Sequence, residues 1–62
     1  MDQISTPKTL ASHRRERRLA KGYSLEDLAV ATGLTVAEIA AAEKPGAQVP
    51  ENHVARIEHA LA

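Results

Sequence analysis

The chain has 62 residues, which is enough for one small domain and too few for a second. It contains no cysteine, so a disulfide framework and a thiolate metal site are both excluded. Eight basic and eight acidic residues give a formal net charge of zero, and the single aromatic residue, Tyr23, leaves a core of aliphatic side chains. No apolar run follows Met1 that would suit a signal peptide or a membrane span, so we expect a cytoplasmic protein.

The N-terminal third predicts a short arm followed by a basic helix. Residues 1–6 are polar and are expected to form a flexible arm, ahead of one domain over residues 7–62. A helix is predicted over residues 7–21, because Thr6 can cap it, Pro7 suits its first position and Gly22 can end it. This segment carries most of the positive charge of the chain, on Arg14, Arg15, Arg17, Arg18 and Lys21.

Two capping patterns follow at a spacing that indicates two short helices. Ser24 is followed three residues later by Asp27, and Thr35 by Glu38, so each hydroxyl can accept from an otherwise unpaired amide at a helix start. Gly33 lies between them and suits a left-handed turn. The predicted helices span residues 25–32 and 36–44.

The last third predicts one more helix. Pro45 and Gly46 interrupt the chain, residues 47–49 cross over, and Pro50 opens a helix. On that helix Val54, Ile57 and Leu61 share one apolar face. The fold class expected is therefore all-α, with four or five helices.

The segment from residue 17 to residue 43 resembles the helix-turn-helix domains of the phage Cro and repressor type, also called the XRE family. The resemblance implies a lambda-repressor-like domain with a central helix-turn-helix. It also implies a transcriptional regulator of bacterial or phage origin, with repression as the expected role. Such a regulator binds double-stranded DNA, either sequence-specifically or with weak specificity, and needs no cofactor. The resemblance runs from about Leu10 to Leu61 and rests on Arg17-Arg18-Leu19, Gly22-Tyr23-Ser24, Leu28-Ala29, Gly33-Leu34-Thr35, Ile39, Glu43, Val54, Ile57 and Leu61.

The resemblance also assigns candidate DNA-binding residues. The second helix of this motif enters the major groove with its first residues on the bases, and here those residues are mostly apolar, which favours weak readout through thymine methyl groups. Glu38 can accept from a cytosine amino group, but its capping role is the favoured interpretation. The start of the preceding helix offers a backbone amide to phosphate at Leu25, where the family often has a glutamine. The base-facing candidates are Thr35, Val36, Ala37, Glu38 and Ala41, and the phosphate-facing candidates are Leu25, Arg14, Arg15, Lys44 and Gln48.

Two arginines of the first helix are expected to contribute to its packing. Arg18 and Glu43 resemble a family ion pair that ties the first helix to the end of the third, and we expect it to be largely buried. Arg14 occupies a position that is usually apolar in the family. Either its stem lies along the core with the guanidinium in water, or the helix is rotated from its usual packing.

Other functions remain open at this stage. The main alternative is a protein-interaction module, such as a partner-binding regulator or an antitoxin-like adaptor, that has kept the fold without DNA readout. An enzyme is the weakest class, since His13, His53 and His59 lack metal-ligand spacing, and we expect no catalytic residue, metal or small-molecule substrate. We expect a weak homodimer or a partner regulatory protein, with Ala55, His59 and Ala62 on the last helix as the candidate contact surface.

Overall fold

The computed structural model describes residues 10–62, and within this range every regular element is an α-helix. The all-α prediction is therefore confirmed, while the predicted arm over residues 1–6 and the helix start at Thr6 and Pro7 lie outside the described residues. No helix between residues 10 and 62 is both long and apolar enough to cross a membrane. The helices are α1 (Leu10–Ala20), α2 (Leu25–Thr32), α3 (Val36–Ala42) and α4 (Glu51–Leu61).

Both predicted helix starts form as the local pattern indicates. The Ser24 hydroxyl accepts from the Asp27 amide at 2.9 Å, and the Asp27 carboxylate accepts from the Ser24 amide at the same distance. Thr35 and Glu38 repeat this reciprocal arrangement at 3.1 and 2.9 Å. Gly33 ends α2 with φ +76° and donates to the Ala29 carbonyl, so the turn into α3 uses a conformation that costs glycine little.

Three predicted boundaries differ from the structure. Helix α1 ends at Ala20, one residue earlier than predicted. Helix α3 ends at Ala42 rather than at Lys44, because the Lys44 amide bonds to Ala41 and tightens the last turn, and because a residue before proline disfavours helical geometry. Pro50 stands at the N-cap of α4 with ψ 142°, so the helix begins one residue later than predicted.

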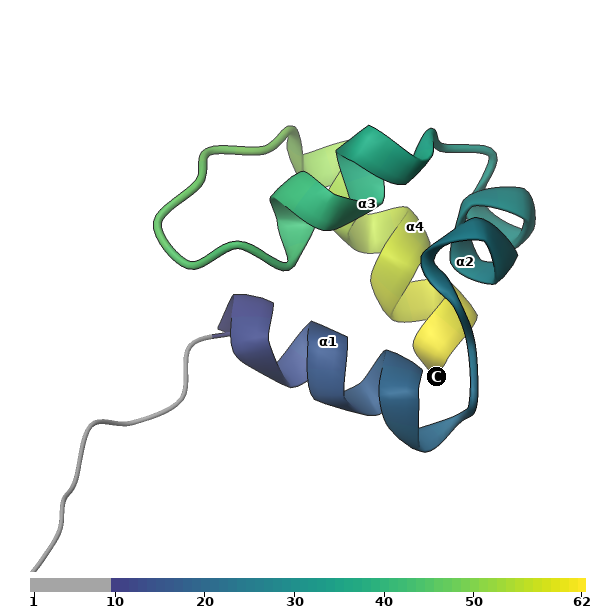
Figure 1. Cartoon of the computed structure of the whole chain (residues 1–62). Helices are drawn as coiled ribbons and strands as arrows, with labels where there is room; N and C mark the ends of the chain where they lie inside the picture. Colours follow the sequence, from purple (N-terminus) through teal and green to yellow (C-terminus); the bar gives the residue numbers. More distant parts are fainter. Residues whose placement is uncertain (1–9) are drawn as a thin grey trace, which may run out of the picture.

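The core is formed by α2, α3 and α4. Leu28, Ile39 and Ile57 are fully buried, one from each of these helices, and Leu34, Ala42 and Leu61 complete the buried cluster. Figure 1 shows α4 in the middle of the molecule, with α1 on one side of it and the α2–α3 pair on the other. Val54, predicted to share the inward face of α4, is half-buried. Burial of these aliphatic side chains holds α2 and α3 at a defined angle on α4.

Helix α1 is attached in a different way. The residues that it buries are Arg14 and Arg18, whereas its leucines Leu10 and Leu19 are 72% and 50% exposed. None of its residues belongs to the apolar cluster formed within residues 10–62. The first helix is therefore held on the domain mainly by the polar contacts of its arginines.

Candidate nucleic-acid interface

The start of α3 presents small apolar groups to solvent. Ile39 and Ala42 point into the core, which leaves Thr35, Val36 and Ala37 exposed at the beginning of the helix. Ala41, also predicted to face bases, is half-buried. The exposed surface of this helix therefore offers methyl groups for contact and few side-chain hydrogen-bonding groups.

Glu38 lies on the same turn, but its carboxylate is already engaged. It accepts from the Thr35 amide at 2.9 Å, as the capping interpretation predicts, and this bond is the main reason why the pKa of Glu38 lies below its ordinary value. Nε2 of His53 lies 3.9 Å from the other carboxylate oxygen. The sequence did not predict that His53 lies near Glu38, because this proximity depends on how α4 packs against α3.

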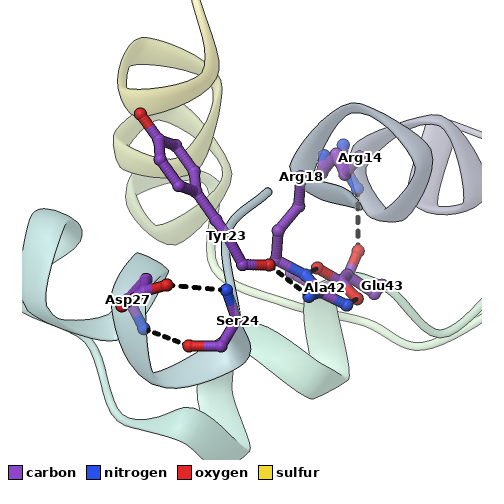
Figure 2. Close-up of polar contacts among 7 residues, drawn as sticks. All are labelled: Arg14, Arg18, Tyr23, Ser24, Asp27, Ala42 and Glu43. Carbon is purple, nitrogen blue, oxygen red and sulfur yellow. Dashed lines mark hydrogen bonds and ion pairs between the residues drawn. The ribbon is translucent and has the colours of Figure 1, made fainter. Parts of the chain in front are cut away.

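The predicted Arg18–Glu43 ion pair is present and buried. Nε and Nη2 of Arg18 contact the two Glu43 oxygens at 2.6 and 3.0 Å, and the two side chains are 8% and 6% exposed. The remaining Arg18 nitrogen donates to the Tyr23 carbonyl at 2.9 Å, which Figure 2 shows beside the capping box of α2. The Glu43 hydrogen bond raises the pKa of Arg18. One guanidinium thus joins α1, the start of α2 and the end of α3.

Arg14 has a structural role that corrects the sequence prediction. Its guanidinium is buried rather than in water, and Nη1 donates to the Ala42 carbonyl at 3.0 Å, at the end of α3 (Figure 2). Its Nε lies 3.0 Å from a Glu58 oxygen on α4, and Arg17 binds the other oxygen of the same carboxylate. Because these donors point inward, Arg14 is not available for the phosphate contact assigned to it. The sequence did not predict Glu58 as the partner of Arg14 and Arg17, because it lies far along the chain from both arginines.

The remaining phosphate-facing candidates lie at the surface. Arg15, Lys44 and Gln48 are exposed, whereas the Leu25 side chain packs partly against the core and leaves its backbone amide as the group to consider. The described part of the chain thus combines an exposed, methyl-rich helix start with separated cationic and polar side chains. Neither a protein-family profile, nor a curated protein, nor a solved structure matches this chain.

Proposed function

We propose that the chain is a lambda-repressor-like helix-turn-helix domain that binds double-stranded DNA and regulates transcription without a cofactor. The observation that carries this proposal is the α2–α3 unit. Each of its helices begins with a closed capping box, Gly33 makes the tight turn between them, and the first turn of α3 is exposed. A short helix held in this way at the surface has the shape needed to enter a major groove.

In this function, affinity comes mainly from contacts between the protein and the phosphates of the DNA backbone. Arg15 and Lys44 supply charge, Gln48 supplies an amide, and the first turn of α2 supplies the Leu25 amide. Val36 and Ala37 then contact thymine methyl groups and read sequence weakly. The chain carries no net charge, so this binding depends on where the cations lie and not on an overall positive field.

A second candidate function follows from the same surface of α3. Val36, Ala37 and Ala40 are exposed together, and small apolar side chains let another helix approach closely. In this case the domain is an interaction module that uses α3 to bind a regulatory protein. The DNA-binding function predicts that the chain binds a DNA duplex, whereas the interaction module predicts that it does not.

Fluorescence anisotropy with a labelled random-sequence duplex separates them. The titration is run at a low and at a physiological salt concentration. As a control, excess unlabelled duplex is added to the saturated sample, and it should reverse an anisotropy change that comes from binding. The DNA-binding proposal expects saturable binding that weakens steeply with salt, because phosphate contacts release condensed counterions. No binding at the lower salt concentration contradicts it and supports the interaction module.

A further inference from the structure

A groove lies between the end of α2 and the second half of α4, away from the residues assigned to DNA. Its volume of about 490 Å³ falls in the range of sites for small organic ligands. Figure 2 shows the Tyr23 ring extending from the α1–α2 connection toward α4, where it forms one wall. The lining residues are Tyr23, Ala31, Thr32, Ala55, Arg56, His59 and Ala60.

Most of this lining is apolar. Three alanine methyl groups and the tyrosine ring supply it, and the Thr32 hydroxyl is not free to bind a ligand. That hydroxyl donates to the Leu28 carbonyl at 2.7 Å and accepts from the Leu34 amide at 3.2 Å. Thr32 is therefore satisfied within the helix turn, and the polar groups left for a ligand are those of Arg56, His59 and Tyr23.

Arg56 differs from the paired arginines of α1. Arg14, Arg17 and Arg18 each contact a carboxylate, whereas Arg56 has no ion pair among residues 10–62. Its Nη1 lies 3.8 Å from the position that a Cβ on Gly33 would occupy, so the guanidinium sits beside the turn between α2 and α3. The Glu38 carboxylate attracts Arg56 electrostatically, but no ion pair or hydrogen bond among residues 10–62 occupies the guanidinium. An exposed guanidinium of this kind, next to an apolar groove, is complementary to a ligand with one anionic group and a hydrocarbon body.

We propose that this groove binds a small apolar carboxylate. The carboxylate pairs with Arg56, and the hydrocarbon lies on the Tyr23 ring and on the methyl groups of Ala31, Ala55 and Ala60. A ligand held there lies against the end of α2, next to the Gly33 turn that Arg56 adjoins. The proposal does not depend on DNA binding, because every residue that carries it lies outside the DNA-facing set.

Titration of the ¹⁵N-labelled free protein with cinnamate tests the proposal, with cinnamamide as a neutral probe of the same shape. We expect saturable shifts of the Ala31, Thr32 and Ala60 amides with cinnamate, and binding of cinnamamide about fivefold weaker, the size of one solvent-exposed ion pair. Arg56→Gln should reduce cinnamate affinity to that of cinnamamide. Arg15→Gln, the same change on the exposed face of α1, should leave cinnamate affinity unaltered.

A second variant tests the apolar part of the site without touching the core. Ala31 is exposed, and Ala31→Leu places a larger side chain in the groove, so both probes should bind more weakly while the circular dichroism spectrum stays unchanged. Equal affinity for cinnamate and cinnamamide, or no saturable shift with cinnamate, overturns the proposal. Concentration-dependent shifts of the same amides without a probe overturn it in favour of self-association through the groove.

Discussion

Arginine has two different roles among the residues of this domain. Arg14 and Arg18 are buried and hydrogen-bonded, while Arg56 is exposed and has no ion pair among residues 10–62. The resemblance to the Cro and repressor type predicted the Arg18–Glu43 pair, because both partners belong to the motif. It did not predict the bond from Arg14 to Ala42, since that contact depends on the angle between α1 and α3 and no short sequence pattern encodes it.

The Arg18–Glu43 pair predicts an asymmetric mutational effect. Arg18→Ala should lower the unfolding free energy by about 3–5 kcal/mol, because Glu43 is then left buried and charged without a partner. Replacing both residues by methionine should cost much less. Urea denaturation measures both values, and Arg15→Ala is the control on the exposed face of the same helix. Similar small losses for Arg18→Ala and Arg15→Ala would contradict the structural importance of the pair.

At the scale of the elements, local rules predicted the starts of helices better than their ends. The caps of α2 and α3 depend on residues three apart, so the sequence alone shows them. The end of α3 depends on Pro45, which disfavours helical geometry at Lys44, and the Ala42 carbonyl there is capped by Arg14 of α1. The exposure of Val36 also follows from the pattern, because the core positions Ile39 and Ala42 fix the orientation of α3.

The start of α3 and the segment that follows its end should respond differently to substitution if the domain binds DNA. Lys44→Ala should weaken binding to all duplexes alike and reduce the slope of log affinity against log salt by about one. Lys21→Ala, which removes a charge from the turn after α1, outside the proposed interface, should leave that slope unchanged. Anisotropy titrations at several salt concentrations provide the comparison. An unaltered slope for Lys44→Ala would remove this residue from the interface.

Val36→Gln tests base contact separately from charge. A glutamine at this position can pair with an adenine edge, which valine cannot do, so the preferred sequence should change while the salt slope stays the same. Selection from a random duplex library, before and after the substitution, measures the preference. If the two proteins select the same sequences, Val36 does not face the bases.

At the scale of the whole molecule, Glu58 links α1 to α4 and introduces acid sensitivity. Its hydrogen bond from Arg17, with a second one from Arg14, holds its pKa below the ordinary value of 4.5. A carboxyl group whose pKa is lower in the folded state stabilises the fold above its unfolded pKa. That contribution is lost as the pH falls through the folded pKa. Stability should therefore decline below about pH 5, where the unfolded chain begins to bind this proton.

Urea denaturation from neutral to acidic pH tests this for the unmodified protein and for Glu58→Gln. The variant should be less stable at neutral pH and should lose less stability on acidification. The difference should be about 1 kcal/mol or less, because Glu58 is 39% exposed and partly screened by solvent. Glu51→Gln, at an exposed position on the same helix, is the control. Parallel pH profiles for the unmodified protein and Glu58→Gln would exclude Glu58 as the group responsible.

If the proposed DNA-binding function holds, two copies of the domain are expected on one operator. Proteins with this motif usually read two half-sites about 34 Å apart, and the methyl-rich start of α3 offers few base contacts per copy. Ala55 and His59, assigned to a dimer surface from the sequence, both line the groove beside α4. Sedimentation equilibrium with a palindromic duplex should show two chains per duplex. One chain per duplex at saturation would exclude a dimeric operator complex.

The attachment of α1 by arginines has a consequence for how the native state fluctuates. Detaching this helix breaks the Arg14, Arg17 and Arg18 contacts but exposes little apolar surface, because α1 contributes nothing to the aliphatic cluster described. Hydrogen exchange of α1 amides should therefore proceed by an opening with a small urea dependence, separate from global unfolding. Exchange at Ile39 and Ile57 should instead follow global unfolding. In about 1 M NaCl, where the screening length is ~3 Å, the exposed Arg17–Glu58 contact should weaken while the buried Arg18–Glu43 pair is screened much less. Protection of α1 should therefore fall only slightly relative to these core amides.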